Sequence, residues 1–207
     1  MMTCHVLIFS GGPAPLSLPE ISVDFVVAAD HGADHAVENG YQVDVLVGDL
    51  DSVTERGEAS AKKVVQHPID KDMTDLELAL EEASKLGATQ VTVVGTLQGR
   101  VDHSFNNLLI LANDRWAHMP ISMLVDSTQV WVVHNSLEVV VPVGTQVSLL
   151  PVGNEVTGVT ANGLRWPLSD ENLLLAEGRG MSNRSILKNV SISVRSGVLL
   201  VFISQPE

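Results

Sequence analysis

Short apolar runs that alternate with helix-like segments most constrain how the first part of this chain can fold. Each run ends at a turn signal, as expected for strands that are buried on both faces of a parallel sheet. One helix-like segment begins with a capping-box pattern at Thr74 and Glu77 and is closed by Gly87. This alternation predicts an α/β domain with a parallel, Rossmann-like sheet. The predicted strands are residues 6–9, 25–29, 43–47 and 91–94, and the predicted helices are residues 33–39, 74–86 and 102–112.

The second part of the chain has a different pattern, with short strand candidates separated by Gly, Pro, Asn and Ser. Few helix signals occur there, so the pattern predicts an antiparallel β-sandwich or barrel-like domain. Ser196 and Gly197 predict a hairpin turn between the last two strands. We expect an α/β domain over residues 1–120 and a β-rich domain over residues 121–207. The strand candidates are residues 121–125, 129–134, 137–141, 146–150, 155–160, 190–194 and 198–203.

The formal net charge of -13 is concentrated in residues 1–114, which hold 18 acidic and 6 basic residues. Acidity argues against non-specific nucleic-acid binding and against docking on an anionic membrane, since both need basic surfaces. The single cysteine, Cys4, excludes an internal disulfide and fits a reducing compartment. The chain lacks a signal-like N-terminus and a membrane-length apolar stretch, so we expect a soluble, cytoplasmic protein.

Two carboxylates, Asp49 and Asp51, directly follow a predicted buried strand. At this spacing they can converge on one hard cation, and Mg²⁺ favours one or two carboxylates together with water and phosphate oxygens. A solvated turn would use the same residues, because Asp and Gly are turn formers. Asp30 follows the preceding strand, where it could accept from a ribose hydroxyl, join the metal group or cap a helix. Ligands of parallel sheets bind at the carboxyl ends of the strands, so these residues predict a site at that edge.

Residues 70–75 combine three carboxylates with Lys71 and Thr74 at the start of a predicted helix. Capping and the helix dipole favour acidic residues at such a position, so a structural role explains the pattern as well. In the functional interpretation, Asp75 joins the metal and Lys71 lies near a phosphate.

Glycines and an arginine are candidate phosphate contacts. Gly11 and Gly12 follow the first strand and could present backbone N–H groups to a phosphate. Arg100 offers a planar fork that matches phosphate, and Asp102 could hold that arginine or a metal-bound water. A surface ion pair between Arg100 and Asp102 and a structural role for His103 are the alternatives.

Several enzyme motifs are absent from the sequence: the P-loop, Gly-x-Gly-x-x-Gly after a strand, Gly-x-Ser-x-Gly and His-Glu-x-x-His. Their absence argues against an ordinary P-loop enzyme, a dinucleotide-dependent dehydrogenase and a zincin. The clustered carboxylates lack the His and Cys partners typical of zinc, so the expected ion is Mg²⁺ or Mn²⁺.

In their order along the chain, these segments resemble the thiamine pyrophosphokinase family, and the resemblance covers nearly the whole chain. Each motif is modest alone, but five in this order are specific. The motifs are Ala-Asp-His-Gly-Ala (residues 29–33), Asp-x-x-x-Gly-Asp-x-Asp-Ser (44–52), Asp-Lys-Asp-x-Thr-Asp-x-Glu-x-Ala-Leu (70–80), Gly-Arg-x-Asp-His-x-x-x-Asn (99–107), and, in the second part, Gly-Leu-Arg-Trp-Pro-Leu (163–168) with Met-Ser-Asn (181–183).

The resemblance implies Mg²⁺-assisted pyrophosphoryl transfer from ATP to thiamine, with thiamine diphosphate and AMP as products. It further implies an N-terminal ATP domain, a C-terminal thiamine domain, and a homodimer with the thiamine site at the subunit interface. The implied site residues are Asp49, Asp51 and Asp75 for the metal; the same three with Arg100 and Asp102 for catalysis; Gly11, Gly12, Asp30, Lys71, Asp72, Thr74, Arg100 and His103 for the nucleotide; and Asn107, Trp166, Ser182 and Asn183 for thiamine.

One position departs from the family pattern, because His31 replaces the first of two glycines that usually follow the first-motif aspartate. A histidine there could narrow the nucleotide site or add a phosphate contact. Two other functions remain open: a related pyrophosphokinase that acts on another primary alcohol, such as a hydroxymethylpterin, and a non-catalytic protein that binds Mg²⁺ or a nucleotide. Lys71 and Arg100 argue against a pure cation site, which gains nothing from adjacent positive charge.

Overall fold

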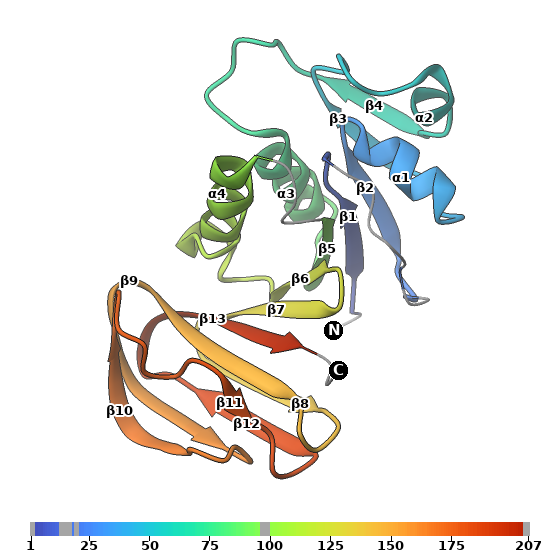
Figure 1. Cartoon of the computed structure of the whole chain (residues 1–207). Coiled ribbons are helices and arrows are strands. Elements are labelled where there is room, and N and C mark those ends of the chain that lie inside the picture. Colours follow the sequence, from blue (N-terminus) through green and yellow to red (C-terminus); the bar gives the residue numbers. More distant parts are fainter. Residues whose placement is uncertain (1–2, 13–17, 19–20, 96–99, 205–207) are drawn as a thin grey trace. The chain divides into compact units, whose positions relative to one another are not determined.

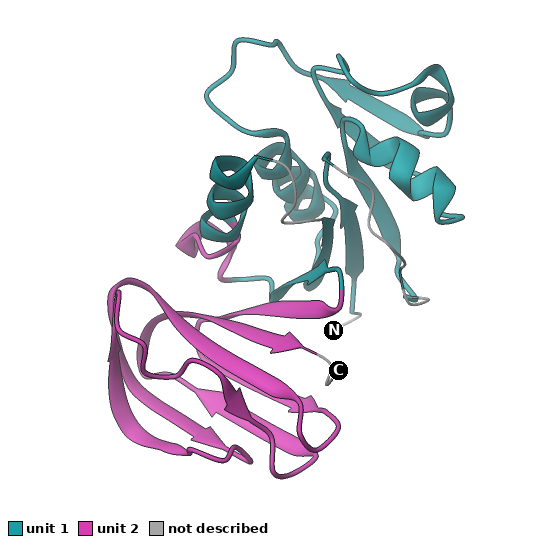
Figure 2. Cartoon of the chain, viewed as in Figure 1, with its two compact units in different colours: residues 1–110, 118–126 teal, residues 111–117, 127–207 magenta. Residues whose placement is uncertain are grey.

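The computed structural model describes residues 3–12, 18, 21–95 and 100–204 of the chain. It contains two compact units, residues 1–110 with 118–126 and residues 111–117 with 127–207 (Figure 2). No helix in the described ranges is long and apolar enough to cross a membrane. The division into functional domains at residues 120 and 121 stays a prediction.

The first unit is built on a parallel sheet in which the strands pair in the order β4-β3-β2-β1-β5-β6 (Figure 1). Every neighbouring pair is parallel, as the uninterrupted apolar runs predict. The strand order reverses at β1, because β2, β3 and β4 extend the sheet to one side and β5 and β6 to the other. The strands are β1 (His5–Phe9), β2 (Phe25–Ala29), β3 (Val45–Gly48), β4 (Lys63–Gln66), β5 (Gln90–Gly95) and β6 (Ile121–Val125).

Helices cover both faces of this sheet (Figure 1). The pair α1 (Gly32–Glu38) and α2 (Glu55–Ala59) lies on one side, and α3 (Asp75–Lys85) and α4 (Val101–Leu111) lie on the other (Figure 1). The capping box of α3 is present: the Thr74 hydroxyl accepts from the Glu77 amide at 3.3 Å, and the Glu77 carboxylate accepts from the Thr74 amide at 3.0 Å. It fixes where α3 begins, just after the loop that carries Lys71.

The second unit is antiparallel, as its alternating strand and turn signals predict. Its strands pair in the order β7-β13-β9-β12-β8, and β10 and β11 also pair with β9. A core that includes Leu149, Val159 and Val201, each 0% exposed, fills this unit. The strands are β7 (Thr128–Val133), β8 (Ser136–Val140), β9 (Gln146–Asn162), β10 (Leu168–Leu174), β11 (Asn183–Arg184), β12 (Asn189–Ser193) and β13 (Ser196–Ser204).

The strands differ from the sequence-based expectation in several places, and β4, β10 and β11 are not among the predicted strands. The predicted first strand of the β-rich part is β6, which pairs parallel with β5 because the segment from β5 through α4 forms a crossover connection. The candidates at residues 146–150 and 155–160 form one long strand, β9. Ser196 and Gly197 begin β13, and the predicted hairpin is wrong, because β12 and β13 each pair with β9 and not with each other.

Candidate active site

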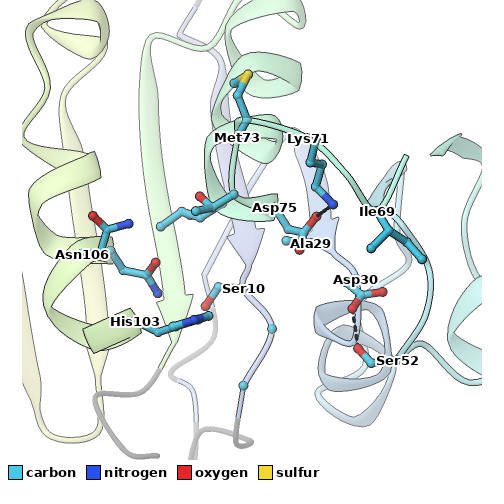
Figure 3. Close-up of a pocket in the computed structure, with 15 residues that line it drawn as sticks. Ser10, Ala29, Asp30, Ser52, Ile69, Lys71, Met73, Asp75, His103 and Asn106 are labelled. Carbon is cyan, nitrogen blue, oxygen red and sulfur yellow. Dashed lines mark hydrogen bonds and ion pairs between the residues drawn. The ribbon is translucent and has the colours of Figure 1, made fainter. Parts of the chain in front are cut away.

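A pocket lies at the carboxyl ends of β1 and β2, next to the point where the strand order reverses. Such switch points are where open α/β sheets bind their ligands. Ser10, Asp30, Lys71 and Asp75 contribute polar atoms to its wall, while Ile69 and Met73 contribute apolar surface (Figure 3). Of the predicted nucleotide and substrate residues, the lining includes Gly11, Gly12, Asp30, Lys71, Thr74, His103 and Asn107; of the predicted metal ligands, it includes Asp75.

Gly48, at the end of β3, lets the chain bend so that carboxylates from different loops come together. Its φ of 147° is one that side chains other than glycine rarely adopt. A Cβ at this position would lie 3.2 Å from Cβ of Asp30 and 3.3 Å from Oδ1 of Asp75. The glycine of the Gly48-Asp49-x-Asp51 motif therefore has a packing role in addition to its conformational one.

Asp30, Asp49 and Asp51 each offer one oxygen to a group whose atoms all lie within 4.8 Å of one another. Asp30 is only 8% exposed; its Oδ2 accepts a hydrogen bond from the Ser52 hydroxyl, and its Oδ1 has no hydrogen-bond partner among the described residues. The charges of Asp49, burial, and the charges of Asp30 and Asp75 raise the pKa of Asp51. An all-oxygen donor set with an unsatisfied buried atom and mutual repulsion fits a hard divalent cation such as Mg²⁺.

Asp75, which the resemblance places at the metal, contacts Lys71 instead of completing this group. The Lys71 ammonium lies 3.2 Å from Oδ2 of Asp49 and 3.0 Å from Oδ1 of Asp75. Burial alone would lower the pKa of Lys71, but its hydrogen bonds and charge interactions with Asp75 and Asp49 outweigh burial and raise it. Burial would raise the pKa of Asp49, yet the Lys71 ammonium and the Asp51 amide lower it overall. Lys71 is thus cationic and Asp49 anionic at neutral pH.

Helix α1 holds two of the loops around the pocket through adjacent side chains. Asp34 accepts hydrogen bonds from the Thr54 amide at 3.0 Å and from the Thr54 hydroxyl, in the segment that follows Asp51. His35 is 4% exposed, and its Nε2–H donates to the Gly12 carbonyl at 2.7 Å. Sequence patterns predict neither role, because the partners lie 20 and 23 residues away in the chain.

His31 is not among the residues that line the described pocket. It adopts a φ of -53° and a ψ of -16°, so its position does not require the backbone freedom of glycine. Its Nδ1 lies 3.1 Å from Oδ2 of Asp34, and its ring packs edge-on against His35. The second glycine of the usual pair, Gly32, is kept, and a Cβ there would lie 2.1 Å from the Phe9 carbonyl oxygen.

Arg100 and Asp102 pair with each other at the start of α4, outside the pocket lining. Two hydrogen bonds of 3.2 and 2.6 Å join them, and their side chains are 71% and 65% exposed. The Arg100 guanidinium lowers the pKa of Asp102 to about 2. Asp72 is exposed and also lies outside the lining, and Gly99 falls outside the described residues.

Asn183, in the second unit, is 3% exposed and holds the backbone of Trp166. Its Nδ2–H donates to the Trp166 carbonyl at 2.7 Å, and its Oδ1 accepts from the Trp166 amide at 3.1 Å. Trp166 is 55% exposed, with the Arg165 guanidinium 5.1 Å from its ring centroid. The adjacent Ser182 has a φ of 55° and donates its amide to the Ser148 hydroxyl. Asn183 thus positions an exposed aromatic ring.

Ser10, Ile69, Met73 and Asn106 line the pocket but are not fixed positions of any quoted motif, and Ser52, a motif residue, is given no role by the sequence analysis. Ser52 lies inside the Gly48-to-Ser52 segment and Asn106 lies beside Asn107, so their sequence neighbours are the available signal. Ile69 and Met73 carry no such signal, because an apolar residue in a polar loop has no chemical signature of its own.

Family comparisons match both units of the chain. The model described as "Thiamin pyrophosphokinase, catalytic domain" matches residues 21–123, and the one described as "Thiamin pyrophosphokinase, vitamin B1 binding domain" matches residues 134–199. Together the two models cover most of the chain.

Individual relatives carry the same name. Thiamine pyrophosphokinase 2 of Arabidopsis thaliana is 28% identical over 80% of this chain, and the chain spans 66% of that relative's length. Thiamine pyrophosphokinase of Bacillus subtilis is 24% identical, with 94% of this chain and 95% of the relative covered. The crystal structure of the Bacillus subtilis protein has the same fold, with a TM-score of 0.85, 23% identity, and 98% and 100% of the two chains covered. That of the Geobacillus thermodenitrificans protein has a TM-score of 0.82 and 26% identity, with 98% of each chain covered.

Proposed function

The chain belongs to the thiamin pyrophosphokinase family, and we propose that it transfers a pyrophosphoryl group from ATP to thiamine, giving thiamine diphosphate and AMP. The observation that carries the proposal is the convergence of Asp30, Asp49 and Asp51 beside Lys71 at the switch point of the sheet. Carboxylates for a metal and an ammonium for phosphate are the combination that a metal–triphosphate substrate requires. The first unit is then a Rossmann-like nucleotide domain.

Mg²⁺, or Mn²⁺ in its place, is the metal that the donor set favours, with Asp49 and Asp51 as ligands and Asp30 as a further member of the group. Asp75, which the resemblance also assigns to the metal, lies beside the group and pairs with Lys71. When bound, the ion would offset the charge of the triphosphate and polarise its phosphoryl oxygens. Gly11 and Gly12 would present backbone amides to phosphate oxygens, and His103, Thr74 and Asp72 would complete the nucleotide contacts.

In the reaction, the thiamine hydroxyl oxygen bonds to the β-phosphorus while the bond between that phosphorus and the bridging α–β oxygen breaks. AMP leaves with the bridging oxygen, and the hydroxyl proton is released. Lys71 and Arg100 neutralise phosphate oxygens, and Asp102 orients Arg100 or assists the hydroxyl. Transfers of this loose type depend mainly on positioning and electrostatics, so a dedicated base is not required.

The thiamine contacts fall on Trp166, Ser182, Asn183 and Asn107. The exposed Trp166 ring offers a face to the cationic thiazolium, and Asn183 supports it from behind. We propose that two chains form a homodimer with thiamine at their interface, as the family resemblance implies.

The proposal is tested by incubating the chain with ATP, Mg²⁺ and a panel of primary alcohols that includes thiamine and a hydroxymethylpterin. We expect AMP and a diphosphate ester with thiamine alone. AMP formation only with the pterin would favour the related pyrophosphokinase, and Mg²⁺ binding without AMP would favour a non-catalytic protein.

A matched pair of variants assigns the activity to the site. Asp49→Asn should lower kcat by orders of magnitude, because it removes a carboxylate charge from the metal group. Asp44→Asn is the control, since Asp44 pairs with Lys62 and Asn retains an acceptor for the Val26 amide. Near-normal turnover by Asp49→Asn in excess Mg²⁺ would contradict the metal assignment.

A further inference from the structure

Lys71 occupies an unusual place for a residue expected to contact phosphate. Its side chain is only 14% exposed, and its ammonium lies between Asp49, from the loop after β3, and Asp75, from the first turn of α3. Figure 3 shows the side chain directed toward Asp75. In this arrangement both of its ion pairs are with carboxylates that the family resemblance places at the metal.

The charges around Lys71 do not balance. Four carboxylates, Asp30, Asp49, Asp51 and Asp75, lie close together, and within the described residues Lys71 is the cation that forms ion pairs with members of this group. Carboxylates at this separation repel one another, since the ligand atoms of Asp30, Asp49 and Asp51 all lie within 4.8 Å. One ammonium therefore leaves most of the negative charge uncompensated, and a divalent cation would be strongly attracted here.

Asp49 is the carboxylate for which the two cations would compete. Its Oδ2 accepts from Lys71 at 3.2 Å, and it also supplies an oxygen to the group with Asp30 and Asp51. Asp75 is likewise engaged by Lys71 at 3.0 Å and belongs to the metal set that the resemblance implies. A metal that takes both carboxylates competes with the ammonium for them, because two cations at one carboxylate pair repel each other.

We propose that Lys71 is the exchange partner of the metal: its ammonium bridges Asp49 and Asp75 in the metal-free chain, and metal binding releases it toward the triphosphate. This inference rests on the proposed function. Lysine suits the role, since its compact charge sits on a flexible four-carbon stem, and Lys71 already lines the pocket. The exchange would ensure that the phosphate-binding cation becomes available only once the metal is present.

The test is to follow the Lys71 ammonium by NMR in the full chain labelled with ¹⁵N-lysine, using Lys71→Arg to assign its signal. In the metal-free protein, the hydrogen bonds to Asp49 and Asp75 should protect the ammonium and make its signal visible. Mg²⁺ alone should abolish or strongly shift that signal, and α,β-methylene-ATP added with Mg²⁺ should restore protection at a new position. The Lys63 ammonium, which pairs with Glu82 at 3.1 Å, is the internal control and should not change.

A second measurement uses Mg²⁺ affinity without nucleotide. Lys71→Met should bind Mg²⁺ on the order of tenfold more tightly than the wild type, because the competing cation is gone, whereas Lys63→Met should bind as the wild type does. A Lys71 signal that is unchanged by Mg²⁺, or an equal or weaker affinity of Lys71→Met, would overturn the exchange. Neither measurement uses thiamine or turnover, so failure of the exchange and failure of the proposed activity are separate outcomes.

Discussion

Asp34 and Thr54 join the first helix to the loop that carries Asp49 and Asp51, the carboxylates proposed to bind the metal. Asp34 accepts both the amide and the hydroxyl of Thr54, so one carboxylate fixes the backbone three residues beyond Asp51. Burial would raise the pKa of Asp34, but these hydrogen bonds and His31 lower it, which keeps the carboxylate ionised. The position of the proposed metal ligands thus depends on a residue outside their group.

Asp34→Ala should therefore weaken Mg²⁺ binding by about tenfold and lower the free energy of unfolding by about 1–3 kcal/mol, since it leaves the Thr54 amide without its acceptor. Mg²⁺ titration and thermal unfolding measure the two effects. Glu38→Ala, on the exposed side of the same helix, is the control. Loss of stability with unchanged Mg²⁺ affinity would show that Asp34 does not position the loop.

The ion pairs of Glu82 should make the free energy of unfolding depend on pH. It is 4% exposed and pairs with Lys85 at 2.7 Å and Lys63 at 3.1 Å. Burial would raise its pKa, but the two lysines outweigh burial and lower it below 4.5. The stabilisation is therefore present above the unfolded-state pKa and is lost as pH falls through the folded-state pKa.

Glu82→Gln should consequently lower the free energy of unfolding by about 1 kcal/mol at neutral pH. Denaturant titrations at a series of pH values should show this difference shrinking below about pH 4.5. A difference that grows on acidification would contradict the sign of the pKa shift.

Replacing Trp166 should change the KM for thiamine but not the KM for ATP. Because its ring is 55% exposed, Trp166→Ala should cost little stability but raise KM for thiamine about tenfold, with KM for ATP unchanged. Trp166→Phe should recover part of the loss, since it keeps an aromatic face. Leu175→Ala, also 55% exposed, is the control. A thiamine KM that Trp166→Ala leaves unaltered would assign the ring to packing instead.

The planar guanidinium of Arg100, and not its charge alone, should be required for efficient use of ATP. Arg100→Lys keeps the charge but loses the two-point geometry that Arg100 uses with Asp102, and it should lower kcat/KM for ATP at least tenfold. Arg56→Lys on α2 is the matched control. Steady-state kinetics at varied ATP concentrations measure the effect. A wild-type kcat/KM for Arg100→Lys would show that Arg100 only forms a surface ion pair with Asp102.

The regular parts of the fold are predictable because a strand that is buried on both faces of a sheet requires apolar residues at consecutive positions. Strand β4 has no apolar run that predicts it, because it lies at the sheet edge, where three of its residues, Val64 among them, are exposed. The sequence predicts two strands where β9 is one, because Pro151, Gly153 and Asn154 are typical turn residues but lie within the strand. An edge position or an irregular strand removes the periodic signal.

The grouping of Asp30, Asp49 and Asp51 is predictable, since carboxyl ends of parallel strands meet at one edge. The partner of Asp75 is not predictable from the sequence. The resemblance places Asp75 at the metal with the other carboxylates, whereas in the folded chain it pairs with Lys71. Asn183 is similar, because a Ser-Asn motif does not reveal that the amide is buried against the Trp166 backbone. Such contacts depend on three-dimensional packing between distant segments.

The most direct test of the central claim is a single turnover with thiamine, Mg²⁺ and ATP that is labelled with ³²P at the β- or the γ-phosphate in separate reactions. Attack at the β-phosphorus predicts that both labels appear in thiamine diphosphate, that unlabelled AMP forms in equal amount, and that thiamine monophosphate does not accumulate. The γ-label in thiamine monophosphate together with the β-label in ADP would contradict pyrophosphoryl transfer.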